Sequence, residues 1–170
     1  ITTSADLKEC YPKSFSVGIG IDSHRFTDKE KKLVLGGVSL PGPGLEANSD
    51  GDVILHALFN ALSSSIGEGS LCLYADDLCK SGIKDSVAYL SIILDKVAKA
   101  GYKINNLSIA IEAAKPRLEP HIPSIKKSLS SLLCLDISKI GITATSGEGL
   151  SDFGRGLGMM CWCYVSLRRV

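Results

Sequence analysis

Alternating and continuous apolar segments predict the strands of this chain. Residues 15–21 alternate apolar side chains with Ser and Gly, and three later segments are mostly apolar. Both patterns are typical of strands. The later segments span residues 104–111, 140–144 and 159–167. In addition, the short apolar segments 33–35 and 38–40 flank Gly36 and Gly37, which predicts a tight hairpin or a bulge.

Three other segments carry apolar residues at helical spacing. They cover residues 49–65, 86–100 and 120–133. The first begins with Ser-Asp-Gly-Asp, which places Ser49 at the N-cap and Asp52 at the third helical position. Gly101 ends the second helix, and Pro120 stands near the start of the third.

The order of these elements predicts an α+β fold. It runs strand, two short strands, two helices, strand, helix and two strands, which indicates helices packed on one face of a mixed sheet. No internal repeat and no linker composition divides the chain. We therefore expect a single domain over residues 15–170, preceded by a polar, irregular N-terminal arm over residues 1–14.

Composition narrows the functional classes. The 170 residues are 45% apolar and 22% charged, as in an ordinary globular protein. A net charge of +1 argues against a broad nucleic-acid-binding surface, so no nucleic-acid partner is expected. No apolar run approaches the roughly 20 residues of a membrane span, so no membrane partner is expected either.

Six cysteines are present, and no pair has CxxC spacing. In a chain of this length they are interpreted as reduced packing residues. They are Cys10, Cys72, Cys79, Cys134, Cys161 and Cys163. The first residues show no basic start followed by an apolar stretch, which favours a cytoplasmic location. Because the sequence does not begin with Met, a removed leader stays open.

The histidines point to metal chemistry. Asp22 and His24 follow the first predicted strand at i and i+2, a spacing that places both side chains on one side of extended backbone. His56 lies one turn into the first predicted helix, on the same face as Asp52. One Asp and two His would give three ligands and an open fourth position, the layout of catalytic zinc, and would suit Zn²⁺ better than Mg²⁺. On spacing alone, a capping or packing histidine is the alternative.

A Gly-rich acidic turn follows the strand at 140–144. Amides and hydroxyls in residues 143–150 could hold phosphate oxygens, and Glu148 could bind a divalent cation that bridges them. The alternative is an ordinary surface loop. The GxGxG pattern at 154–158 precedes a strand instead of a helix, which argues against a dinucleotide site. No GxSxG motif is present, which argues against a serine hydrolase.

Four segments, in order along the chain, carry a specific resemblance. Residues 18–26 fit GxGxDxHxF, and the other segments are residues 35–57, 115–123 and 143–156. Together they resemble the 2-C-methyl-D-erythritol 2,4-cyclodiphosphate synthase family of the non-mevalonate isoprenoid pathway, from about residue 16 to residue 167. That family consists of homotrimers of α+β subunits, with active sites between neighbouring subunits. Its enzymes convert 4-diphosphocytidyl-2-C-methyl-D-erythritol 2-phosphate to the cyclic diphosphate and release CMP.

The resemblance also implies roles for individual residues. Asp22, His24 and His56 match zinc ligands, and Glu148 matches the ligand of a second cation, Mg²⁺ or Mn²⁺. Glu148, Thr145 and Ser49 match residues that take part in catalysis. The implied partner is the cytidine diphosphate-linked substrate. The residues expected to bind it are Asn48, Ser49, Glu68, Ala113, Arg117, Leu118, Thr145, Ser146 and Arg155.

This chain departs from the family pattern at four positions. Asn48 and Asn60 replace the usual His and Asp, so neither can carry the same charge. Arg117 replaces a common Lys, and Leu157 replaces a Glu that follows the Arg-Gly pair. Two alternatives to the synthase therefore stay open: a metal-dependent phosphoesterase or nucleotide hydrolase, and a non-catalytic trimer that binds a nucleotide or a metal.

Overall fold

The computed structural model describes residues 15–170, with the backbone alone at positions 76 and 77. The predicted N-terminal arm and Cys10 lie outside the described residues. The elements, in chain order, are β1 (Phe15–Arg25), β2 (Leu33–Leu35), β3 (Val38–Leu40), α2 (Val53–Ser65), α3 (Cys72–Lys80), α4 (Ser86–Lys99), β4 (Tyr102–Glu112), η1 (Glu119–His121), α5 (Ile122–Leu133), η2 (Ile137–Lys139), β5 (Ile140–Thr145), η3 (Gly147–Gly149) and β6 (Gly158–Arg169).

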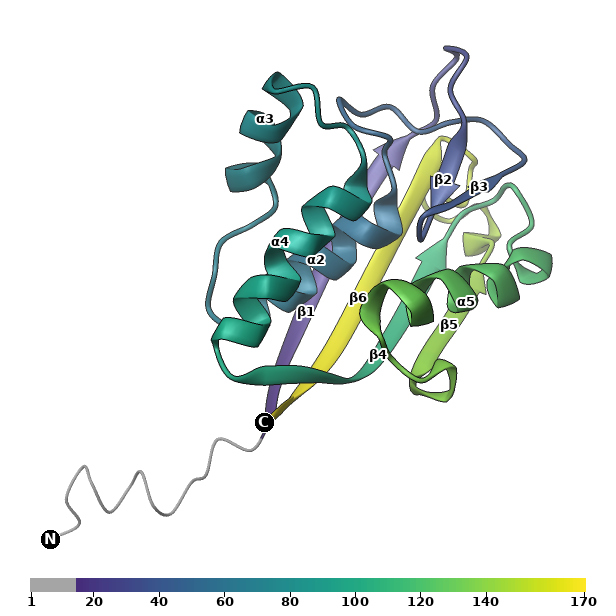
Figure 1. Ribbon diagram of the computed structural model, residues 1–170. Coiled ribbons are helices and arrows are strands. Elements are labelled where there is room, and N and C mark those ends of the chain that lie inside the picture. The colour runs from purple at the N-terminus through teal and green to yellow at the C-terminus, as the bar shows by residue number, and fades with distance from the viewer. Residues whose placement is uncertain (1–14) are drawn as a thin grey trace, which may run out of the picture.

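The main sheet has four strands in the order β1-β6-β4-β5. β6 pairs antiparallel with both of its neighbours, and β4 pairs parallel with β5, so the sheet is mixed. Helices α2, α4 and α5 lie on the same side of this sheet (Figure 1). The strands β2 and β3 form a separate hairpin that turns at Gly36 and Gly37, both with positive φ. The predicted α+β architecture with a mixed sheet and a hairpin is confirmed.

The two faces of the sheet differ in what they contact. Side chains on the helix side of β6 and β4 are buried in one core, which includes Cys161, Cys163 and Ile109. On the opposite face, several side chains are apolar and exposed where β1 and β6 pair. The large ones are Phe15, Val17, Ile19, Ile21 and Tyr164. One face of the sheet is therefore covered within the chain, and the other presents apolar surface.

Helix α2 lies unusually close to β1 because of two glycines. A Cβ atom at Gly20 would stand 2.0 Å from the carbonyl oxygen of Ala57, and one at Gly18 would meet the carbonyl oxygen of Ala61 at 1.9 Å. Only glycine leaves room for the helix backbone at these distances. The two glycines that begin the first motif therefore serve packing.

The start of α2 differs from the prediction. Asp52, and not Ser49, is the N-cap, and its carboxylate accepts the N–H groups of Ile54 and Leu55 at 3.1 and 3.0 Å. The same buried carboxylate also accepts the N–H groups of Gly36 and Gly37 at 2.9 and 2.7 Å. The predicted cap was wrong because this long-range acceptance from the hairpin draws the carboxylate into the cap position.

Helix α3 was not predicted from the sequence. Tyr74, Ala75 and Leu78 pack on the core from one side of this short helix, which lies between Gly69 and Gly82. Its few apolar positions gave a weak periodic signal. The other predicted helices are confirmed over most of their length, although η1 replaces the predicted first turn before α5.

The cysteines of the described region carry free thiols. Cys161 and Cys163 are buried and pack in the core, as expected, whereas Cys72 and Cys134 are exposed, so the interpretation as packing residues was wrong for these two. Within residues 15–170, none of the helices has the length and apolar character needed to cross a bilayer. The cytoplasmic location stays a prediction.

Candidate metal and substrate site

Strand β1 and helix α2 together position the candidate metal ligands. β1 continues to Arg25, so Asp22 and His24 lie within the strand and not after it, paired with Cys161 and Met159 of β6. Their side chains share the face of Gly18 and Gly20, and that face is turned toward α2. Because the glycines hold α2 close, His56 in the first turn of the helix meets both side chains.

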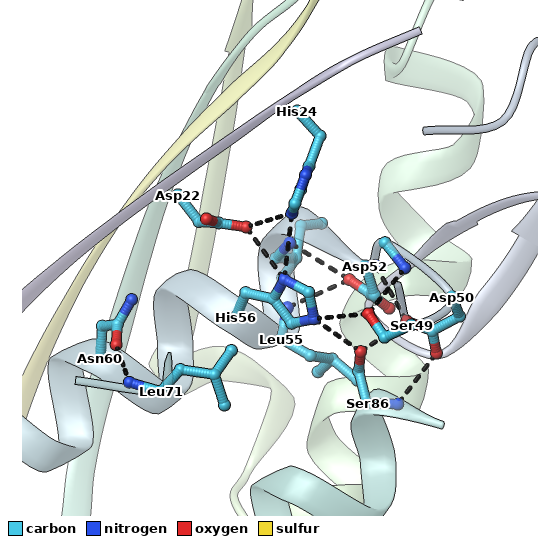
Figure 2. Close-up of polar contacts among 12 residues, drawn as sticks. Asp22, His24, Ser49, Asp50, Asp52, Leu55, His56, Asn60, Leu71 and Ser86 are labelled. Carbon is cyan, nitrogen blue, oxygen red and sulfur yellow. Dashed lines mark hydrogen bonds and ion pairs between the residues drawn. The ribbon is translucent and has the colours of Figure 1, made fainter. Parts of the chain in front are cut away.

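The three side chains converge on one point (Figure 2). Oδ2 of Asp22 lies 3.0 Å from Nε2 of His24 and 3.0 Å from Nδ1 of His56, and the two ring nitrogens are 3.2 Å apart. Ligands bound to zinc at about 2.0–2.1 Å in a tetrahedron stand roughly 3.3–3.4 Å from one another. The spacing and the one-carboxylate, two-imidazole donor set therefore fit a zinc ion. Among the described residues 15–170, Asp22, His24 and His56 are the one group of three His, Cys, Asp or Glu side chains whose ligand atoms lie close enough together to hold a metal ion.

Electrostatics within the cluster follow from its own contacts. Burial by itself would raise the pKa of Asp22, but hydrogen bonds to His24 and His56 outweigh it, and the pKa lies below its ordinary value. Burial by itself would lower the pKa of His24, but the neighbouring Asp22 carboxylate raises it above the ordinary value. The carboxylate is therefore held in its charged form, the form that binds a cation.

The cluster opens into a cavity of about 350 Å³. Its lining includes Asn48, Ser49 and Asn60, together with α3 and α4 residues such as Cys72 and Tyr89. Asn48 is exposed, whereas Ser49 is buried with Oγ 3.3 Å from Nε2 of His56. The structure thus brings two of the predicted substrate residues beside the predicted metal ligands.

Lys31 fixes the shape of the segment that carries Asn48 and Ser49. Its ammonium group donates to the carbonyl oxygens of Leu45, Ala47 and Ser49 at 2.7, 3.2 and 2.8 Å. All three N–H donors of the ammonium group are therefore directed at this one segment. Sequence reasoning did not identify Lys31, since nothing in its local pattern marks it.

A second group of predicted residues lies where β4 and β5 end. Ala113, Arg117, Leu118, Thr145 and Ser146 line a separate cavity of about 320 Å³. The strands stay joined past their ends, because the N–H of Ala113 donates to the carbonyl of Thr145 at 3.0 Å. The predicted nucleotide-binding residues are therefore brought together, but not beside the metal cluster.

A comparison with protein families identifies the family of this chain. The model of the YgbB family matches residues 15–168, which covers nearly the whole described region. The chain belongs to the YgbB family. The resemblance to 2-C-methyl-D-erythritol 2,4-cyclodiphosphate synthases read from the four motifs is confirmed.

Individual proteins similar to this YgbB-family chain support the same resemblance. A 2-C-methyl-D-erythritol 2,4-cyclodiphosphate synthase of Chlamydia trachomatis is 45% identical over 157 residues, which cover 90% of this chain and 88% of the relative. A solved synthase structure described as the CDP-bound form has a TM-score of 0.78 at 31% identity, covering 89% of this chain and 99% of that one. The bifunctional IspDF of Campylobacter jejuni has a TM-score of 0.85 at 33% identity; 92% of this chain is covered, but the match spans 42% of that longer protein.

Asn60, one of the four departures named in the sequence analysis, has a structural role here. Its Oδ1 accepts the N–H of Leu71 at 2.9 Å (Figure 2). Its Nδ2 donates to the carbonyl of Ile21 at 3.4 Å. An aspartate could accept the first bond but could not donate the second. The amide therefore links α2 to β1 and to the loop before α3, at the edge of the cavity.

Three other predicted residues lie away from the metal cluster. Glu148 is exposed, has a φ of 49°, and accepts from Oγ of Ser146 at 2.9 Å. Glu68 pairs with Lys96 at 3.0 Å, and Arg155 pairs with Asp152 at 2.5 Å. In a single copy, the structure therefore does not bring these side chains to Asp22, His24 and His56.

Proposed function

We infer that this chain converts 4-diphosphocytidyl-2-C-methyl-D-erythritol 2-phosphate to 2-C-methyl-D-erythritol 2,4-cyclodiphosphate and releases CMP. The observation that carries the inference is the Asp22, His24 and His56 cluster at an open cavity, in a chain whose family match spans residues 15–168. The name of the Chlamydia trachomatis relative and the CDP-bound state of a solved one support it. The enzyme is then a phosphorus–oxygen lyase of isoprenoid precursor biosynthesis.

Two cation positions follow from the side chains present. Asp22, His24 and His56 would hold zinc through one oxygen and two nitrogens, and Glu148 would offer hard oxygen ligands for Mg²⁺ or Mn²⁺. When bound, these cations supply positive charge to the diphosphate and to the leaving CMP. The cavity formed by Ala113, Leu118 and Thr145 is the proposed cytidine site.

The reaction is an intramolecular phosphoryl transfer. An oxygen of the 2-phosphate forms a bond to the β-phosphorus, while the bond from that phosphorus to the oxygen bridging the α-phosphate breaks. The bridging oxygen leaves with the electron pair as part of CMP. A phosphate monoester is anionic near neutral pH and attacks without a protein base. The residues of the chain hold the substrate folded with its ends together, an entropic advantage that reaches about 7–11 kcal/mol in well-oriented reactions.

A homotrimer with sites between neighbouring copies completes the proposal. The metal cluster lies on β1 at one edge of the sheet, and Thr145 lies at the end of β5, which forms the other edge. The exposed apolar face that includes Val17, Ile19 and Tyr164 offers surface for burial between copies. Ser49 and Asn48 would then contact the methylerythritol end of a substrate whose cytidine end lies on the next copy. Glu68 and Arg155 are proposed as further contacts.

Product analysis tests the activity. Incubation of the chain with the substrate, Zn²⁺ and Mg²⁺ should yield a cyclic diphosphate and CMP in equal amounts, observed by phosphorus NMR. A linear product would identify the phosphoesterase or nucleotide hydrolase alternative. Stoichiometric binding without turnover would identify the non-catalytic alternative.

Mixing two inactive variants tests the shared site. His56→Ala damages the metal half and Glu148→Gln the nucleotide half, so co-expression should restore activity to about a quarter of the wild-type value if copies assemble at random. Each variant alone is the matched control. A mixture as inactive as its components would mean that every copy holds a complete site of its own.

A further inference from the structure

The second ring nitrogen of His56 contacts a buried serine. Nε2 of His56 lies 2.8 Å from Oγ of Ser86, and that hydroxyl lies 2.5 Å from Oδ1 of Asp50 (Figure 2). We propose that Ser86 and Asp50 are positioning residues that fix which nitrogen of His56 carries the proton and so hold Nδ1 ready as a metal ligand. This inference rests on the metal role proposed for Asp22, His24 and His56.

The Asp50 carboxylate, at the end of the contacts from His56 through Ser86, sets the direction of these hydrogen bonds. An ionised carboxylate only accepts, so the hydroxyl of Ser86 donates its proton to Asp50. The serine oxygen then presents a lone pair to His56, and Nε2 must carry the proton that it accepts. Nδ1 can then offer its lone pair to a cation held together with Asp22 and His24, whereas without a cation a proton on Nδ1 is donated to Oδ2 of Asp22, 3.0 Å away. Ser49 also approaches Nε2, but at 3.3 Å, so the shorter contact to Ser86 sets the proton.

Both positioning residues are themselves held rigidly. Ser86 is 1% exposed and is the first residue of α4. Its backbone N–H donates to Oδ2 of Asp50 at 2.9 Å, and Oδ1 of Asp50 also accepts the N–H of Asp52 at 3.0 Å. The carboxylate thus connects the loop before α2 to the start of α4. The ring of His56 is held from behind by two segments other than its own helix, as outer partners of metal-binding histidines commonly are.

Replacing the carboxylate by an amide should reverse the chain of hydrogen bonds. In Asp50→Asn an NH₂ group at the Oδ1 position donates to Oγ of Ser86 and frees the serine hydroxyl to donate to Nε2, although the N–H of Asp52 then loses its acceptor. The ring proton then moves to Nδ1, where it blocks the ligand atom. Ser86→Ala removes the acceptor without supplying a donor, so it leaves the proton unspecified. Asp50→Asn should therefore weaken metal binding more than Ser86→Ala.

Zinc affinity of the full chain, measured by competition with a chromogenic chelator, tests the proposal. Removing an outer partner typically costs 10–100-fold in metal affinity, so we expect about 10-fold for Ser86→Ala and toward 100-fold for Asp50→Asn. Asp85→Asn is the matched control: this exposed N-cap of α4 caps through Val87, and the variant makes the same chemical change next to Ser86. It should bind zinc like the wild type.

Heteronuclear NMR of the histidine rings shows which nitrogen of His56 carries a proton. That position would not change if Ser86 and Asp50 had only a structural role. The wild type and Asp85→Asn should show a proton on Nε2 of His56, and Asp50→Asn should lack it. Should Asp50→Asn fail to fold, the affinity of Ser86→Ala decides. Affinities within about 2-fold of wild type in the variants, with zinc lost in His56→Ala, would overturn this inference alone. Zinc retained in His56→Ala would instead overturn the proposed metal site.

Discussion

Replacing Gly20 by Ala should destabilise the chain through a backbone collision. The added Cβ would lie 2.0 Å from the carbonyl oxygen of Ala57 and 2.3 Å from the amide nitrogen of Ala61, where ordinary contacts are about 3.5 Å. Because both atoms belong to the backbone of α2, no side-chain rotation relieves the contact, and the helix must retreat by roughly 1.5 Å. Overpacking usually costs 1–3 kcal/mol, so we expect about 3 kcal/mol, the upper end.

Urea unfolding followed by circular dichroism, at equal protein concentrations, measures this loss. In a chain of this size, about 3 kcal/mol corresponds to a fall of roughly 6–12 °C in the melting temperature. Gly141→Ala is the matched control, since a Cβ there meets Leu107 and Ser108 only at 3.9 Å. Its stability should be unchanged or higher by up to about 1 kcal/mol. Equal stabilities of the two variants would refute the argument that Gly20 provides clearance for α2.

Two further predictions concern carboxylates. Glu148→Gln should lower turnover steeply and change its dependence on Mg²⁺ concentration while leaving the melting temperature nearly unchanged, because the side chain is exposed and holds the proposed second cation; wild-type kinetics in the variant would mean an ordinary turn residue. Asp52→Asn should cost about 1–3 kcal/mol in the free energy of unfolding, because an amide group cannot accept all four backbone N–H groups that the carboxylate accepts. Asp136→Asn, at an exposed cap, is the control for the latter, and equal losses in the two variants would contradict it.

Much of the fold was predictable because periodicity reports directly on burial. The mixed sheet, the hairpin at Gly36 and Gly37, and α4 all follow from local patterns. What local patterns could not give were contacts between distant segments. Asp52 caps α2 because its carboxylate also meets the hairpin, and β1 extends through His24 because β6 pairs with it to the end.

The candidate site was predictable in part for the same reason. The i, i+2 spacing of Asp22 and His24 indicated convergence, His56 in the first predicted helix was the third candidate ligand, and the family resemblance supported all three. The sequence did not identify Ser86 and Lys31, because their roles depend on packing between loops and helices that no spacing rule describes. The separation of Glu148 from the metal cluster was likewise visible only in three dimensions.

In the segment before α2, the ammonium group of Lys31 occupies the position that a bound cation would take among the carbonyl oxygens. Converging carbonyl oxygens normally repel one another unless a cation or water lies between them, and here the ammonium group fills that position from a neighbouring loop. The ordering of this segment is therefore completed during folding and needs no recruited ion. A substrate that contacts Asn48 and Ser49 therefore binds to a preorganised segment, and its binding free energy is not reduced by the cost of ordering the loop.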